Sequence, residues 1–148
     1  MPNDISAGEY QALAEFRYQI RSFLAFSKNA ALAAGVEPQQ HQLMLALKAA
    51  DPKPATVQYL AGRLQLRHHS TVELIDRMEA LNLVRRRRSK EDRRSAEIRL
   101  TPKGTKILRE LSLYHRRELR SAIPALIKSL TLILDGHESQ HVEKQSRA

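Results

Sequence analysis

The sequence contains no cysteine and no tryptophan among its 148 residues. The absence of cysteine excludes both a disulfide framework and a thiol-based redox sensor. Aromatic residues make up only 5% of the chain, and no apolar run approaches the roughly 18 residues that a membrane span needs. The first residues, Met1–Ser6, lack the basic-then-apolar pattern of a secretory signal, so we expect a cytoplasmic chain without membrane association.

Positive charge, by contrast, is abundant and concentrated. The chain has 25 basic residues against 16 acidic ones, for a formal net charge of +9. Residues 85–99 alone hold eight basic residues and three acidic ones. Charge this dense on one segment indicates a surface patch with an anionic partner, and duplex DNA is the obvious candidate.

The same basic segment shows the two-residue period of half-buried strands. Two stretches alternate in this way: Val84, Arg86 and Arg88 with Arg85 and Arg87, and then Ala96, Ile98 and Leu100 with Glu97 and Arg99. The pattern predicts a β-hairpin with a cationic turn over Ser89–Ser95. Alternation also divides the arginines 85–88: we expect two to point to solvent or DNA and two to lay their stems along the protein.

Elsewhere, apolar residues recur at three- and four-residue steps, which predicts helices. The expected spans are residues 8–33, 38–49, 57–64, 68–81 and a long helix after Thr101–Pro102. Thr56 and Thr101 are suited to cap helix starts, and Asn82 suits a left-handed helix stop. We expect Pro124 to break or restart the last helix.

The first and last helices carry more apolar surface than a small nucleic-acid-binding lobe could cover, which favours a dimer interface. The alternative is that these helices only cover their own domain. We therefore expect a helical dimerisation region in residues 1–35 and 105–135, a DNA-binding lobe in residues 36–104, and a polar C-terminal tail in residues 136–148.

Three segments, in order and at matching spacing, resemble the MarR (multiple antibiotic resistance regulator) family of bacterial transcription factors. They are Leu60–Leu64, the run from Ile75 to Arg86, and Glu91–Ser95 closed by Leu100–Gly104. The resemblance implies a mainly α fold with a small β-hairpin: a winged helix-turn-helix with long N- and C-terminal dimerisation helices. It also implies a homodimeric, non-enzymatic transcriptional repressor or other regulator that binds a pseudo-palindromic operator; the sequence does not distinguish repression from activation.

Site residues follow from this reading. In the major groove, the recognition helix would read bases with its N-terminal outward residues. These are His68, His69, Ser70, Val72 and Glu73. The expected phosphate contacts are Arg77, Arg85, Arg86, Arg87 and Arg88 on the lobe, and Lys90 and Arg93 in the wing. The resemblance places Arg94 in the minor groove, held by Asp92. Family members usually carry a small hydroxyl residue near position 72 and glycine at position 82, so the operator sequence does not carry over.

An effector is also implied by the resemblance, namely a small aromatic or phenolic molecule bound between the dimer helices and the DNA-binding lobe. The candidate lining residues are Phe16, Arg17, Tyr18, Arg21 and His41. The same residues also fit an ordinary assignment to core and surface. No cofactor is expected.

Two other functions remain open. A nonspecific architectural nucleic-acid binder would share the basic charge but prefer no sequence. A zinc hydrolase is suggested by His137–His141, which fits the H-E-x-x-H pattern. Against this, the segment follows Gly136 without an apolar stripe, and no third ligand lies at the usual distance, so we expect neither a metal nor an enzyme.

Overall fold

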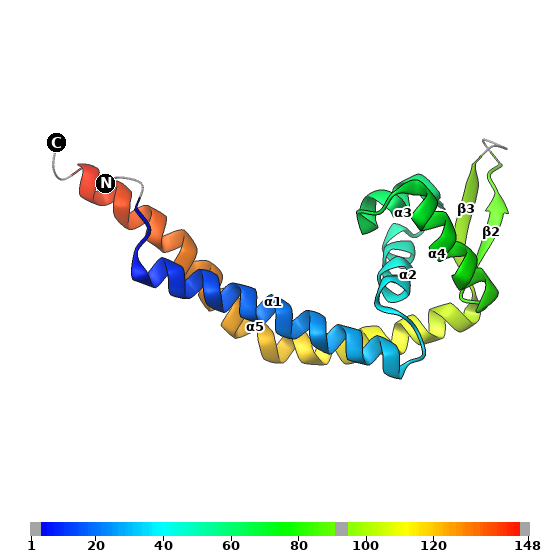
Figure 1. The fold of residues 1–148 in the computed structure, drawn as a ribbon, viewed down its shortest axis with the longest axis horizontal. Coiled ribbons are helices and arrows are strands. Elements are labelled where there is room, and N and C mark those ends of the chain that lie inside the picture. The colour runs from blue at the N-terminus through cyan, green and yellow to red at the C-terminus, as the bar shows by residue number, and fades with distance from the viewer. Residues whose placement is uncertain (1–3, 91–94, 146–148) are drawn as a thin grey trace. The chain divides into compact units, whose positions relative to one another are not determined.

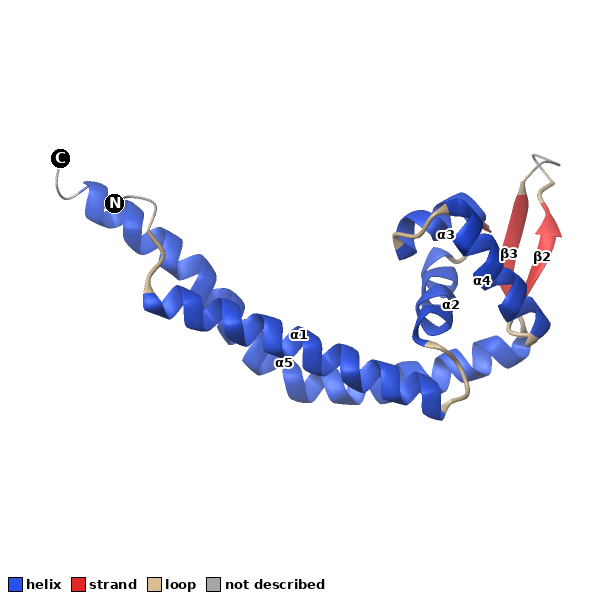
Figure 2. Cartoon of the chain, in the orientation of Figure 1, coloured by secondary structure: helices blue, strands red, loops and turns tan. Residues whose placement is uncertain are grey.

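The computed structural model describes residues 4–90 and 95–145, with side chains through residue 135. The elements, in chain order, are α1 (Ala7–Ala33), α2 (Pro38–Ala50), β1 (Ala55–Thr56), α3 (Val57–Leu64), α4 (His68–Ala80), β2 (Val84–Arg88), β3 (Ala96–Leu100) and α5 (Pro102–Gln145) (Figure 1). Helices dominate, and the strands form one small sheet (Figure 2). The expected fold class is confirmed.

Contacts divide the chain into two compact units. Residues 1–27 with 115–148 form one, which we call the helical unit, and residues 28–114 form the other, the winged unit. The division falls inside α1 and α5 rather than near residues 35 and 105, because the ends of both helices join the core of the winged unit, through Ala30, Ala31, Leu108 and Leu111.

The winged unit has a continuous apolar core to which α2, α3, α4 and the sheet contribute. Its largest fully buried apolar side chains are Leu43, Met44, Leu60, Leu74, Ile75, Met78, Leu83, Val84 and Ile98. Each such side chain contributes roughly 1.5–3 kcal/mol on burial. Apart from Leu83, which lies between α4 and β2, these residues stand at three- and four-residue steps in the helices or at alternate positions in the strands, as the periodicity predicted. Leu81, which the same periodicity placed on the inward face, is instead 46% exposed, because α4 ends at Ala80.

The sheet has three antiparallel strands in the order β1-β3-β2. The predicted hairpin is confirmed, with Val84 opposite Leu100 and Arg88 opposite Ala96. The third strand, β1, was not predicted, because two residues cannot show a period. It forms where the buried Ala55 lies opposite Ile98 of β3.

Three predicted helix signals are confirmed, two by side-chain hydrogen bonds and one by a backbone angle. Thr56 accepts a hydrogen bond from the Tyr59 amide at 3.2 Å, and Thr101 accepts one from the Gly104 amide at 3.0 Å. Asn82 has a φ of 57°, the left-handed conformation expected just after α4.

In the helical unit, α1 and α5 run side by side (Figure 1). Ala12 and Ser129 are each only 2% exposed. His115 Nε2 lies 2.8 Å from Ser27 Oγ, and its ring lies edge-on to Phe23 and Phe26, with centroids 5.9 and 5.4 Å away. Small residues and one buried histidine therefore hold this pair of helices together.

α5 is longer than expected. The predicted break at Pro124 is wrong, because this proline lies inside a single helix that continues past Gly136 to Gln145. A proline in a helix interior removes one backbone hydrogen bond, at a cost of about 3 kcal/mol, and Pro124 is nevertheless accommodated inside α5. The segment expected to be a polar tail is thus helical up to Gln145, since its residues are compatible with a helix once one is started.

None of the helices in residues 4–90 and 95–145 combines the length and apolar character needed to cross a membrane.

Gly104, at the start of α5, has no room for a side chain. A Cβ there would lie 2.2 Å from the Leu83 carbonyl oxygen, so Gly104→Ala must displace backbone. We expect a loss of more than about 2 kcal/mol in the free energy of unfolding, measured by urea denaturation. Gly62→Ala is the matched control, because nothing lies within 4 Å of its Cβ position. That change should be neutral or stabilising by up to about 1 kcal/mol, and equal losses in both variants would contradict this account.

Candidate nucleic-acid interface

Helix α4 presents one apolar and one polar face. Thr71, Leu74, Ile75 and Met78 are buried in the winged unit. At 100° per residue, His69 and Glu73 lie opposite this buried face, one helical turn apart, and both are exposed. Among the other predicted base-reading residues, His68 is exposed, whereas Ser70 and Val72 are half-buried at the sides of the helix.

The start of α4 follows a tight turn after α3. Gln65 adopts a left-handed conformation with φ of 54°, which ends α3 and turns the chain. No side chain caps the helix at Arg67. Within the first turn, the Thr71 hydroxyl donates to the Arg67 carbonyl oxygen at 3.0 Å. This short connection between α3 and α4 sets the orientation of the first turn of α4 within the lobe.

The four arginines of β2 do not divide two and two. Arg85, Arg87 and Arg88 are exposed, and Arg86 is half-buried. Val84, Arg86 and Arg88 share one face of the strand. Val84 lies in the core, and Arg86 bonds to α4. Arg88 is two residues closer to the hairpin tip and is exposed, so the expected burial of a second arginine stem is wrong.

Arg86 is held by a set of hydrogen bonds to α4. Its Nη1 donates to Glu79 Oε1 at 2.9 Å, and its backbone amide donates to Glu79 Oε2 at 3.1 Å. Its Nη2 bonds to Asp76 Oδ1 and to the Val72 carbonyl oxygen, the latter at 3.4 Å. The sequence predicts a DNA phosphate contact for Arg86 and indicates no role for Glu79. A sequence signal for this contact exists: the acidic residues Asp76 and Glu79 lie three positions apart on the helix that precedes the arginine-rich strand.

Arg77, on the opposite side of α4, has a weaker partner. Its Nη2 lies 3.9 Å from Glu37 Oε2, and the two side chains are 53% and 58% exposed. Water screens an ion pair this open and this long. The Arg77 guanidinium is therefore an accessible positive charge on the surface of α4, as a phosphate contact requires.

At the tip of the hairpin, the Ser89 amide donates to the Ser95 carbonyl oxygen at 3.1 Å, which closes the loop. Lys90 is exposed. Asp92, Arg93 and Arg94 lie outside the described residues, so the roles predicted for them stay predictions.

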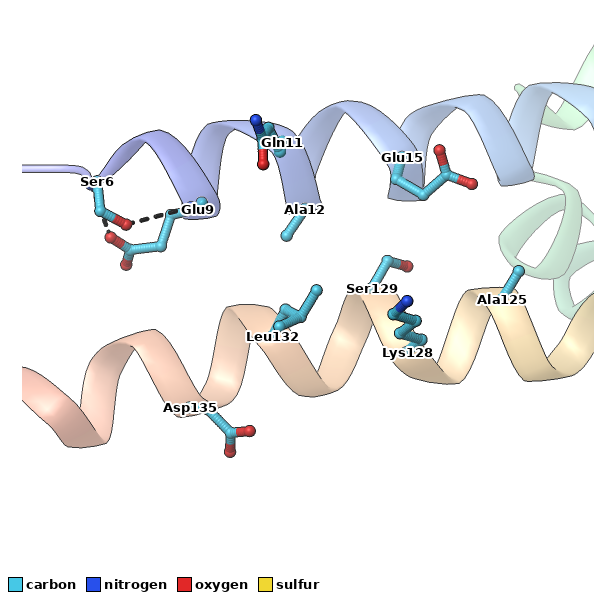
Figure 3. Close-up of a pocket in the computed structure, with 11 residues that line it drawn as sticks. Ser6, Glu9, Gln11, Ala12, Glu15, Ala125, Lys128, Ser129, Leu132 and Asp135 are labelled. Atoms are coloured by element: carbon cyan, nitrogen blue, oxygen red, sulfur yellow. Dashed lines mark hydrogen bonds between the residues drawn. The ribbon is translucent and has the colours of Figure 1, made fainter.

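The five candidate effector residues lie on different units. Phe16, Arg17, Tyr18 and Arg21 belong to α1 in the helical unit, and His41 is buried in the winged unit. Figure 3 shows a hollow between α1 and α5 in which Ala12 and Leu132 point toward each other, and its lining includes none of the five. The effector stays a prediction of the resemblance.

Metal binding finds no support in the part of the chain whose side chains are described, where no three histidine or acidic groups could hold an ion. The H-E-x-x-H segment, residues 137–141, lies in the helical backbone of α5, and its side chains are outside that part.

Two helices joined by a tight turn, the second exposing polar side chains, and an arginine-rich hairpin beside it define a winged helix-turn-helix lobe. Residues 34–95 match the model of the MarR family. Over these residues, the winged lobe is similar to the MarR family.

Similar proteins agree with this assignment. An uncharacterized HTH-type transcriptional regulator, YsmB of Bacillus subtilis (strain 168), is 37% identical over 65 residues, a segment that spans 44% of this chain and 44% of YsmB. AbsC, a MarR family transcriptional regulator from Streptomyces coelicolor, is 19% identical with a TM-score of 0.72 over 98% of both chains. MepR of S. aureus, in a complex with DNA, is 20% identical with a TM-score of 0.61 over 80% of this chain and 97% of MepR. The two solved structures establish the fold of nearly the whole chain.

The small contribution of the exposed Arg77–Glu37 ion pair to stability can be tested. Because the pair is exposed and 3.9 Å long, Arg77→Ala should change the free energy of unfolding by less than about 1 kcal/mol. Urea denaturation of the wild type and the variant measures this difference. A larger loss would show that Arg77 is a structural tie and not an available surface charge.

Proposed function

We propose that this protein is a sequence-specific transcriptional regulator, a repressor or an activator, that binds duplex DNA as a homodimer. The observation that carries the proposal is the pairing of two exposed features on one lobe. Helix α4 exposes His69 and Glu73 on its outer face, and the neighbouring strand β2 exposes Arg85, Arg87 and Arg88. One feature suits base edges, and the other suits the phosphates on either side.

Each side chain of α4 suits a particular base-edge group. Glu73 accepts a hydrogen bond from cytosine N4, and His69 donates to or accepts from purine edges. His68 and Ser70 can donate in the same groove, and Val72 can contact a thymine methyl group. His69 and Glu73 lie one turn apart, so they would read bases in the same half-site.

The exposed arginines of β2, together with Arg77 and Lys90, would neutralise phosphates and supply affinity without sequence preference. The resemblance adds Arg94 in the minor groove, where a narrow groove concentrates negative potential, with Asp92 beside it. A dimer of such lobes would require half-sites about one helical turn apart.

Selection from a random duplex library with the purified protein should return a pseudo-palindromic consensus. Glu73→Gln should then change the preferred base at one symmetric pair of positions, because the amide no longer only accepts hydrogen bonds. Arg87→Gln is the matched control: it should weaken binding to all sequences alike and lower the salt dependence. Titrations of consensus and mutated duplexes at several salt concentrations measure both effects.

Binding without any consensus, with a steep salt dependence, would contradict the proposal and favour a nonspecific architectural binder. A uniform loss in Glu73→Gln would contradict base reading by this residue.

Dimer formation is supported by the apolar surface of the helical unit. Its exposed large apolar side chains are Ile5, Tyr10, Leu13, Tyr18, Ile20, Leu24, Ile123, Ile127, Leu130, Leu132 and Leu134. Leaving so much apolar surface in water is costly at about 25 cal/mol per Å². A second copy with the same surface would cover it by two-fold symmetry.

Charges placed on this surface should separate the dimer. Ile127 and Leu134 are 56% and 70% exposed, so proteins that carry Ile127→Glu or Leu134→Glu should fold normally. Each would bury two uncompensated charges per symmetric interface, which should weaken dimerisation at least about a hundredfold. Leu45→Glu is the control, because Leu45 is 49% exposed on the winged unit. Sedimentation across a concentration series measures the change, and a wild-type monomer, or dimers unaffected by both substitutions, would refute the interface.

A further inference from the structure

Arg86 differs from the other arginines of β2 because its side chain lies along the recognition helix. Its partners Val72, Asp76 and Glu79 follow the i, i+4, i+7 spacing of one helix face. The side chain is 29% exposed. Both terminal nitrogens of its guanidinium already donate to α4, so few donors remain for a phosphate.

We propose that Arg86 is a positioning residue that fixes the wing to the recognition helix and pairs with two carboxylates there, offsetting part of their negative charge, so that both elements meet DNA as one rigid body. The proposal rests on the function proposed above and deepens it. It replaces the direct phosphate contact that the sequence suggested for Arg86.

The backbone contributes to the same connection. In the order β1-β3-β2, strand β2 lies at an edge of the sheet, where outward amides have no strand partner. The Arg86 amide donates to Glu79 Oε2, while Glu79 Oε1 accepts from the guanidinium. One carboxylate therefore holds both the backbone and the side chain of the same residue, which fixes the strand in position and orientation relative to α4.

Charge gives the connection a second effect. Asp76 and Glu79 are 56% and 40% exposed on the proposed DNA-reading helix, where an unpaired carboxylate would be repelled by phosphates. Arg86 lies between them and offsets this repulsion. Its removal would release the wing and, in addition, uncover two negative charges.

A double-mutant cycle separates positioning from phosphate contact. Arg86→Met is measured in the native background and in the Asp76→Asn/Glu79→Gln background, using the selected duplex. If Arg86 is a positioning residue, Arg86→Met should raise the Kd about tenfold in the native background and less than about twofold in the Asp76→Asn/Glu79→Gln background. Arg85→Met is the matched control. It should raise the Kd by the same factor in both backgrounds, because Arg85 is exposed. An equal loss for Arg86→Met in both backgrounds, or no loss at all, would overturn the proposal.

A conservative variant tests the geometry separately from the charge. Lysine keeps the positive charge but cannot bridge three acceptors with a planar fork. Arg86→Lys should therefore remain several-fold weaker than the wild type, although tighter than Arg86→Met. Wild-type affinity in Arg86→Lys would overturn the positioning role. Unfolding curves for every variant ensure that binding is measured on folded protein.

Amide hydrogen exchange tests the connection without DNA. Arg86→Met should speed exchange at the amides of residues 84–88 in the free protein, relative to amides in the middle of α4 such as that of Ile75. Unchanged exchange would overturn the proposal. If the wild type prefers no duplex sequence, the proposed function fails, while this measurement still decides whether Arg86 holds the wing.

Discussion

The hydrogen bonds around Thr101 are the constraint on which the winged unit depends. Its hydroxyl donates to the Asn82 carbonyl oxygen at 2.6 Å and accepts from the Gly104 amide at 3.0 Å. Its own amide donates to the Leu83 carbonyl oxygen at 3.1 Å. One residue thus joins the end of α4, the start of β2 and the first turn of α5. The missing side chain of Gly104 lets these backbones approach each other, and buried polar groups so joined are costly to separate.

This junction fixes only the base of the wing, and the hydrogen bonds of Arg86 fix its middle. Between them, β2 cannot pivot on α4 without breaking bonds at one site or the other. For the proposed recognition of DNA by two elements, such rigidity would lower the conformational entropy lost on binding. The neighbouring arginines also differ in their contacts: Arg86 is half-buried against α4, whereas Arg85, Arg87 and Arg88 face solvent. Four consecutive residues of one type therefore have two different environments.

Much of the fold was predictable from local patterns. Helix spans, the hairpin register and the caps at Thr56 and Thr101 follow from periodicity and from a few cap residues. The patterns failed where a distant neighbour decides the outcome. β1 exists because Ala55 meets Ile98, and α5 continues through Pro124, which the local pattern alone does not indicate. The exposed base-reading candidates on α4 could be identified from helix geometry alone, but the partners of Arg86 could not.

The sequence by itself determined which residues are apolar, which segments are helical or extended, and where positive charge is dense, because these properties depend on residues a few positions apart. Only the tertiary structure decided which charges are paired. Arg86 meets Val72 across 14 residues of sequence, and alternation along β2 cannot reveal that contact. The environment of a charge is set by groups that folding brings together, so identical residues in one strand acquire different roles.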